Sequence, residues 1–293
     1  MRKVFQEVVS EKMLANENLY LLLGDIGVFG FRAIAEQIPS RVKNMGIMEQ
    51  AMVSFASGIA KMGGIPILHS IAPFLIERPL EQIKVDFGYQ GLPGKFVSVG
   101  GSFDYSHLGG THHAPGDVAA FGAIPDSEIW IPAGNKDLKG VLQREIDSSN
   151  LTYFRLSERP SEEAIDPGPV GIRTISRGSR LTVVAIGPML TEALEATKGL
   201  DVTLLSLNRI KPFPIKELIS ASSGSEEKVL FIEPYYEGLT SMFIEDLAWS
   251  HKVRYVGVRK AFLHDYGNFE HLQALAGLDP SSIRERIELA MND

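Results

Sequence analysis

Cysteine is missing from this chain of 293 residues, which excludes disulfide bonds, a thiolate nucleophile and metal sites held by cysteine. A surplus of positive charge is missing too. The sequence carries 29 Lys and Arg against 36 Asp and Glu, a formal net charge of −7, so we expect no nucleic acid partner. No apolar run approaches the roughly 18 to 20 residues of a membrane-spanning helix, and the residues after Met1 lack the apolar core of a signal peptide. These absences predict a cytoplasmic protein with no membrane partner.

The chain does contain a regular alternation of short apolar strands and helices. With 44% hydrophobic residues, it is long enough to form two cores. A segment at 161–172, rich in proline and acidic residues and without periodicity, is typical of an interdomain linker. Before this segment, the sequence predicts helices at 49–62 and 77–87 and strands at 19–23, 42–45, 65–71, 95–99, 129–132 and 152–156. After it, the sequence predicts helices from Met189, near Pro214 and from Leu239, and strands at 181–186, 202–207, 229–232 and 253–258. The sequence therefore predicts an α/β fold with two domains, 1–160 and 173–293, each a mostly parallel sheet covered by helices.

The segment Gly46-Ile47-Met48-Glu49-Gln50 places a carboxylate at the start of an expected helix. Because a helix start favours negative charge, Glu49 on that ground alone is a helix-start residue. The small residues Ala51, Ala56 and Gly58 make the helix thin, which would bury the carboxylate against the sheet. A buried carboxylate is suited to share a proton with a heterocycle, and the ends of parallel strands are where ligands of such sheets bind.

Phe74 and the run Thr111-His112-His113 lie after later strands. Phe74 is either an ordinary core residue or a ring that stacks on a ligand. Adjacent histidines point in different directions, and no carboxylate or third histidine lies at a ligand-like spacing, so we expect no metal on this chain. The glycine-rich segment 100–110 lets the backbone approach a ligand closely or forms a flexible surface loop. It has no G-x-G-x-x-G pattern before a helix, which argues against a dinucleotide site.

Short motifs follow one another along the first half of the chain. They are Gly46-Ile47-Met48-Glu49-Gln50, Gly58-Ile59-Ala60, Gly63-Gly64-Ile65-Pro66, residues 74–83, Thr111-His112 and Ile131-Pro132-Ala133. In this order and spacing they resemble the pyrimidine-binding domain of transketolase-like, thiamine-diphosphate-dependent enzymes. The segment from Thr182 to the C-terminus resembles the family's C-terminal domain. The resemblance therefore spans nearly the whole chain, and it implies the transketolase fold for both domains.

The resemblance implies roles for several of these residues. Glu49 would bond N1′ of the cofactor's aminopyrimidine and promote the tautomer that removes a proton from the thiazolium ring, Phe74 would stack on the pyrimidine, and His112 would contact the donor substrate. Arg155 and Arg159 fall near the family's phosphate-contacting arginine, and an arginine suits a phosphate, although both also suit the surface at the edge of a linker. The implied residues are Glu49 and His112 as catalytic; Glu49, Phe74, Met48 and Gln50 as cofactor-binding; and His112, Arg155, Arg159 and His69 as substrate-binding.

The chain departs from the family pattern in two respects. Transketolases commonly carry an acidic residue before the Gly-x-Thr-His segment, where this chain has His107-Leu108, so a hydrogen bond to a sugar hydroxyl is missing. The family's Gly-Asp-Gly and later Asn-Asn motifs, which hold the diphosphate and its metal, are absent. The resemblance therefore implies that a separate N-terminal, diphosphate-binding transketolase-like subunit holds the diphosphate end of thiamine diphosphate with Mg²⁺ or another divalent ion.

The function implied is that of the C-terminal subunit of a split transketolase, active only with its partner, which transfers a two-carbon ketol unit between sugar phosphates or related ketose and aldose substrates. By analogy we expect two subunits of each kind in a heterotetramer, with self-association across the pyrimidine-binding and C-terminal domains. One alternative is a deoxyxylulose-phosphate-synthase-like subunit, and another is a 2-oxoacid dehydrogenase E1 β-like subunit, which Thr111-His112 disfavours. A third is a non-catalytic scaffold subunit, which the replaced acidic residue permits and the retained Glu49, Phe74 and His112 argue against.

Overall fold

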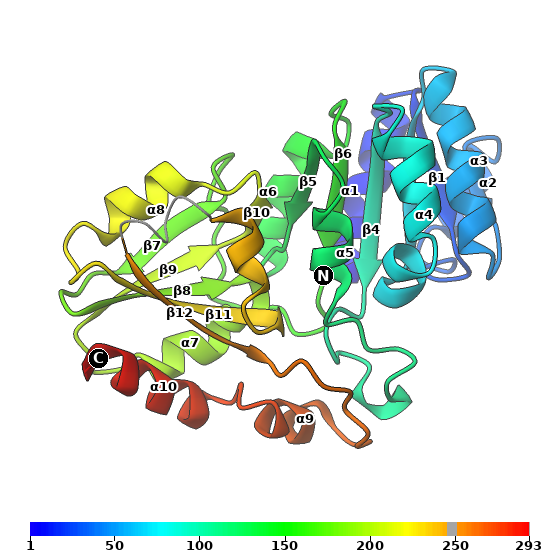
Figure 1. Cartoon of the computed structure of the whole chain (residues 1–293). Helices are drawn as coiled ribbons and strands as arrows, with labels where there is room; N and C mark the ends of the chain where they lie inside the picture. Colours follow the sequence, from blue (N-terminus) through cyan, green and yellow to red (C-terminus); the bar gives the residue numbers. More distant parts are fainter. Residues whose placement is uncertain (245–250, 293) are drawn as a thin grey trace.

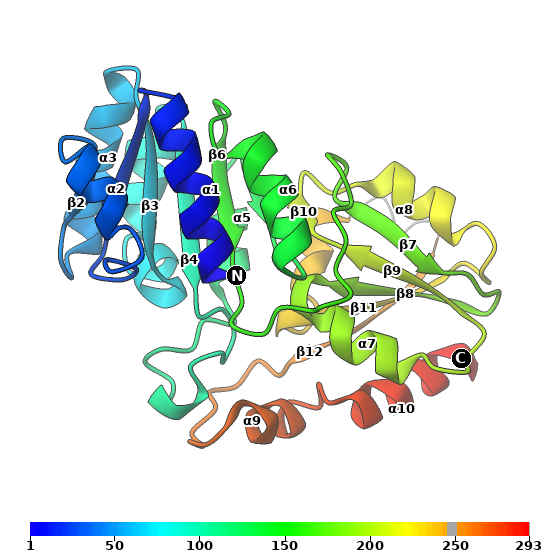
Figure 2. The same ribbon diagram turned by 180° about the vertical axis from the view of Figure 1, so that it is seen from behind.

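The computed structural model describes residues 1–244 and 251–292. Two sheets lie side by side, each with helices on both faces (Figures 1 and 2). The larger sheet has the strand order β10-β5-β6-β4-β3-β1-β2. Its strands are β1 (Leu19–Leu23), β2 (Val42–Asn44), β3 (Ile65–Ile71), β4 (Gly94–Val99), β5 (Ser127–Trp130), β6 (Leu151–Arg155) and β10 (Arg209–Lys211). The first six run parallel, and β10 joins β5 antiparallel.

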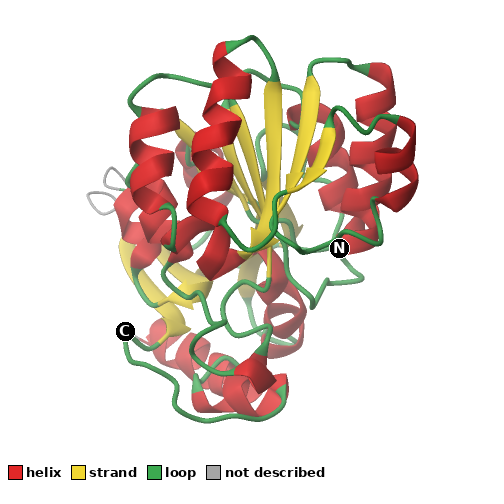
Figure 3. Ribbon diagram, turned by 90° about the vertical axis from the view of Figure 1, so that its right-hand side faces the viewer, coloured by secondary structure: helices red, strands yellow, loops and turns green. Residues whose placement is uncertain are grey.

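Helices cover both faces of this sheet because its strands are apolar on both sides. Leu21 and Leu23 of β1 face one core and Leu22 faces the other, as the two-residue period of a strand requires. One face is covered by α1 (Arg2–Ala15), α2 (Arg32–Gln37) and α6 (Asn135–Glu145), and the opposite face by α3 (Glu49–Lys61), α4 (Leu80–Gln82) and α5 (Asp117–Gly122). Figure 3 shows the strands between these helical layers.

The smaller sheet has the order β12-β11-β8-β9-β7. Only the edge strand β7 pairs antiparallel among its described strands. Its strands are β7 (Ile172–Ser176), β8 (Leu181–Ile186), β9 (Val202–Leu207), β11 (Lys228–Tyr236) and β12 (Lys252–Val258). The helices α7 (Leu190–Ala196) and α10 (Pro280–Asn292) cover one face, and α8 (Ile215–Ser222) covers the other. The helix α9 (Phe269–Leu275) lies beyond the sheet edge. The expected fold class, two mostly parallel sheets covered by helices, is confirmed.

The two halves share a core. One cluster of buried residues joins Phe121 and Ile129 of the first half to Val184 and Phe231 of the second, and β10, from the second half, completes the first sheet. The expected linker at 161–172 falls between β6 and β7. The division of the chain at that segment stays a prediction, since residues 209–211 cross back to the first sheet.

The single helix expected at 77–87 is wrong in detail. Two π-helical turns, Pro73–Glu77 (η1) and Ile83–Gly88 (η2), flank the short α4. In the first, the amide of Arg78 bonds to the carbonyl of Pro73, 3.0 Å away. Pro79 has no N–H to continue an α-helical ladder, and the chain widens at this point. The helix expected from Leu239 is a 3₁₀ turn, Leu239–Phe243, and residues 245–250 lie outside the described part.

Among the described residues, no helix is both long enough and apolar enough to cross a membrane.

Candidate functional site

Glu49 lies at the start of α3, beside the carboxyl end of β3. Gly46, with φ +73°, turns the chain from β2 toward this helix. The Glu49 side chain is only 1% exposed. The Ser70 hydroxyl on β3 donates to Oε1 over 3.2 Å, and Nη1 of Arg78 donates to Oε2 over 2.5 Å. The carboxylate is therefore buried but paired, and its orientation is fixed from two elements.

Arg78 extends the contacts of Glu49 to an aromatic ring. Its guanidinium carbon lies 4.3 Å from the centre of the Phe74 ring, close enough for a cation–π contact. The His112 ring meets the same Phe74 edge to face, with ring centres 5.1 Å apart and planes at 73°. Phe74 is partly exposed and packs only at the margin of the core. We call Glu49, Ser70, Phe74, Arg78 and His112 the Glu49 cluster.

The structure thus brings together three residues predicted from the sequence, Glu49, Phe74 and His112. Arg78 was missed, because a charged residue in an expected helix reads as part of a solvated face. A signal did exist: Phe74 and Arg78 are four residues apart, a spacing that places side chains together on one helical face.

The flanking residues Met48 and Gln50 lie at the surface. Met48 is 57% exposed, and Gln50 is exposed as well. Their predicted role in cofactor binding stays a prediction.

His69 is adjacent to Ser70 on β3 but points through the opposite face of the sheet. Its ring is fully buried and packs on Phe5, with centres 4.8 Å apart. Nδ1 lies 2.7 Å from the Val97 carbonyl, whereas Nε2 is buried without a hydrogen-bond partner. Burial lowers the pKa of His69 to about 4, so the ring is neutral near pH 7. The sheet separates His69 from the Glu49 cluster, and its predicted contact with substrate has no support in this geometry.

Arg155 is committed to an internal ion pair. It is 2% exposed, and its Nε donates to Oδ2 of the fully buried Asp117 over 2.7 Å. Its Nη2 reaches the backbone carbonyls of Ala114 and Pro234, at 3.2 and 3.3 Å. Pro234 lies on β11, so this arginine ties the two halves together. These bonds use Nε and Nη2, and with 2% of the side chain exposed the geometry indicates a structural role. The predicted substrate contact of Arg155 stays a prediction.

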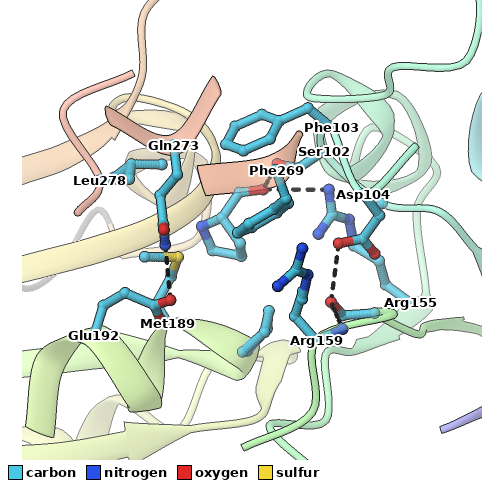
Figure 4. A pocket seen from close by; sticks show the side chains of 14 residues that line it. Ser102, Phe103, Asp104, Arg155, Arg159, Met189, Glu192, Phe269, Gln273 and Leu278 are labelled. Atoms are coloured by element: carbon cyan, nitrogen blue, oxygen red, sulfur yellow. Dashed lines mark hydrogen bonds between the residues drawn. The ribbon is translucent and has the colours of Figure 1, made fainter. Parts of the chain in front are cut away.

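Arg159 lies near the surface beside a small cavity of about 30 Å³ between the two halves (Figure 4). Its Nη1 pairs with Glu270 at 2.7 Å, and its guanidinium lies 4.4 Å from the Phe269 ring centre. On the other side of this cavity, Gln273 donates to Glu192 over 2.7 Å. Both partners of Arg159 belong to α9, so its polar contacts lie away from the Glu49 cluster, and its predicted role at a phosphate stays a prediction.

No group of three or more His, Asp or Glu side chains within residues 1–244 and 251–292 is placed to hold a metal ion.

Comparison with known proteins gives consistent matches. The family model for the transketolase pyrimidine binding domain matches residues 1–162. An uncharacterized 33.6 kDa protein of the Rhodococcoides fascians fasciation locus is 32% identical over 287 residues, 97% of this chain and 92% of that protein. The B subunit of the apulose-4-phosphate transketolase of Phocaeicola vulgatus is 25% identical over 296 residues, 96% of this chain and 94% of its own length. The 6-deoxy-6-sulfo-D-fructose transketolase subunit SqwH of a Clostridium species is 27% identical over 297 residues, with coverage of 97% and 92%.

Among solved structures, a split gene transketolase described as an inactive beta4 tetramer aligns with a TM-score of 0.84 at 22% identity, over 99% of this chain and 97% of that chain. The fold and the family match agree, and the chain belongs to the transketolase family through its pyrimidine-binding domain. Its second half completes the arrangement of the C-terminal half of a transketolase, and over nearly its whole length the chain is similar to single subunits of split transketolases. The resemblance inferred from the motifs is confirmed.

Proposed function

We propose that this chain is the C-terminal subunit of a split, thiamine-diphosphate-dependent transketolase that transfers a two-carbon ketol unit between sugar phosphates or related anionic sugars. The observation that carries the proposal is the Glu49 cluster: a buried carboxylate that Arg78 links to a partly exposed aromatic ring, with a histidine against the same ring.

The cluster fits the aminopyrimidine end of the cofactor. The guanidinium of Arg78 is a flat group with N–H donors, and it lies on Phe74 while it donates to Glu49. A protonated aminopyrimidine is also flat and also donates N–H, so the same two partners suit it. When bound, thiamine diphosphate supplies a carbon nucleophile that can add to the carbonyl of a ketose.

Each residue of the cluster then has a defined task. Glu49 holds a proton at the ring nitrogen, and its burial excludes water from that bond. Phe74 fixes the plane of the ring by stacking. His112, at the edge of Phe74, exchanges hydrogen bonds with an oxygen of the donor substrate. Ser70 and Arg78 orient the carboxylate.

A second, different polypeptide is part of the proposal because the diphosphate needs a metal with oxygen ligands, and the described residues offer no cluster to hold one. Apolar side chains around α3 are exposed, among them Ile47 at 69%, Phe55 at 54%, Met62 at 89% and Tyr89 at 90%. Exposed apolar patches of this kind mark interaction surfaces. A relative named as one lettered subunit of its enzyme implies another, and the related solved tetramer is described as inactive.

The test is reconstitution. We expect the chain mixed with its N-terminal, diphosphate-binding partner, thiamine diphosphate and Mg²⁺ to transfer a two-carbon unit from a ketose phosphate to an aldose phosphate, measured by mass spectrometry of the products, and neither polypeptide to do so alone. Turnover of pyruvate with an aldehyde phosphate, and none of ketose phosphates, would instead assign a deoxyxylulose-phosphate-synthase type of reaction. A mixture that assembles but stays inactive with every donor would favour the scaffold alternative.

A further inference from the structure

A second cavity, of about 130 Å³, lies between the two halves of the chain. Its walls come from both halves. The first half contributes Glu77 at the end of the first π-helical turn, Ser102, Phe103, Gly110, His113, Pro115 and Gly116, and the second contributes Tyr236 of β11 and residues 261–263. Glu49, Phe74 and His112 do not line it. The cavity is thus distinct from the Glu49 cluster.

His113 lines this cavity and carries an unused hydrogen-bond acceptor. The side chain is 8% exposed, and its ring is hydrogen-bonded to the backbone of Tyr105. Nε2 is buried and has no partner. A neutral imidazole that donates from Nδ1 to a carbonyl carries a lone pair on Nε2, and burial together with the neighbouring His112 lowers the pKa of His113. Nε2 of His113 can therefore accept a hydrogen bond from a ligand.

Glu77 presents a carboxyl without a counter-ion. Within the described residues it makes no hydrogen bond or ion pair. Glu77 lies at the mouth of the cavity and is partly exposed to solvent. Its partial burial and the charge of Asp117 together raise its pKa to about 7, and the charge of Arg155 opposes this rise. Tyr236 lines the same cavity, and burial and the charge of Glu77 raise the pKa of its phenol. Two oxygen-bearing groups and one nitrogen acceptor thus line one cavity.

The other residues that line the cavity favour a positively charged ligand over an anion. Neither Lys nor Arg lines the cavity, so an anion would meet the Glu77 carboxyl without compensation. Phe103, Phe262 and Tyr236 supply aromatic surface, which attracts cations. A protonated amine has N–H donors for the acceptors of the cavity and a positive charge that compensates the Glu77 carboxylate. A neutral polyol can donate hydrogen bonds but cannot compensate the charge.

We propose that this cavity binds a small primary ammonium compound, whose N–H groups bond the Glu77 carboxylate, Nε2 of His113 and the hydroxyl of Tyr236. Gly116 leaves room for it: a Cβ there would lie 3.5 Å from Glu77 Oε1 and 3.6 Å from Tyr236 Cε2. The backbone of Gly116, with φ −104°, accepts any L-residue. A larger side chain at position 116 would therefore fill the cavity without backbone strain.

The test is calorimetric titration of the full chain with ethanolamine, and with glycerol as the neutral probe, in two buffers of different ionisation enthalpy. Because the ammonium group needs Glu77 ionised, we expect ethanolamine to bind with release of about half a proton near pH 7. Its affinity is expected to rise between about pH 6 and about pH 8, because Glu77 ionises across that range. Glycerol is expected to give no heat beyond dilution.

Three variants test which residues are responsible for the binding. Glu77→Gln and Gly116→Leu should each abolish binding by distinct means, one by charge and one by volume. The exposed Glu81→Gln, on α4, is the matched control and should bind as the unaltered chain does. Equal binding of glycerol without proton release would make the cavity a polyol site and overturn the proposal. Ethanolamine binding that survives Glu77→Gln, or no binding by a cooperatively folded chain, would overturn it as well.

Discussion

Replacing Glu49 by glutamine is expected to lower the turnover of the reconstituted enzyme by roughly 10²- to 10⁴-fold, the usual contribution of a positioned proton-transfer group. Glutamine keeps the size of the side chain and an acceptor for the Ser70 hydroxyl, but it does not hold a proton for the ring nitrogen. Because Arg78 is 37% exposed, water can solvate its released guanidinium, so the fold and assembly should be retained. Steady-state kinetics with saturating cofactor, together with size-exclusion chromatography, measures both properties.

Glu17→Gln is the matched control for this loss. Glu17 is exposed and precedes β1, on the side of the sheet away from the Glu49 cluster, so its variant should keep full turnover. A Glu49→Gln enzyme with unaltered turnover would remove Glu49 from the catalytic machinery. A variant that fails to assemble would show instead that the carboxylate serves the interface with the other polypeptide.

Replacing Asp117 by alanine is expected to destabilise the folded chain by about 3 to 5 kcal/mol, the range for removing one partner of a buried ion pair. Asp117 is fully buried and accepts hydrogen bonds from Tyr153 Oη at 2.6 Å and Arg155 Nε at 2.7 Å. Without it, the guanidinium of Arg155, 2% exposed, stays in the core with only backbone carbonyls as partners. Chemical denaturation followed by circular dichroism measures the change in the midpoint of unfolding.

Two comparisons separate charge burial from a general loss of packing. Glu288→Ala removes the exposed Arg284 pair of α10, 2.9 Å long, and should cost only about 0.3 to 0.5 kcal/mol. The double variant Asp117→Leu with Arg155→Met removes both charges and should recover much of the loss, because apolar groups of similar size often replace a buried ion pair at little cost. If Asp117→Ala were as mild as Glu288→Ala, the buried pair of Asp117 and Arg155 would not contribute to the stability of the fold.

The sequence predicts the buried parallel strands well because such strands are continuous apolar runs. The run 181–186 is an example: it is the fully buried β8. The strands β7 and β10 were not predicted. β7 is an edge strand with mostly exposed or partly exposed residues, and β10 has only three residues, so neither carries a hydrophobic pattern long enough to detect.

Part of the geometry of the candidate site could be predicted from the sequence, whereas long-range pairings could not. Glu49, Phe74 and His112 lie in motifs whose order the sequence displays. The pairing of Arg155 with Asp117 joins residues 38 positions apart, from β6 to α5, and a phosphate-binding arginine and a buried structural one look alike in a linear sequence. For His69 the period of the strand does supply a signal, since Ser70 points toward Glu49 and its neighbour must therefore point to the opposite face.

The central claim, that this chain holds only the pyrimidine end of thiamine diphosphate, is tested most directly by calorimetric titration of the cofactor with Mg²⁺ into the chain alone and into the chain mixed with its diphosphate-binding partner. We expect no tight binding by the chain alone and stoichiometric binding by the mixture. Tight binding by the isolated chain, or none by an assembled mixture, would contradict the account.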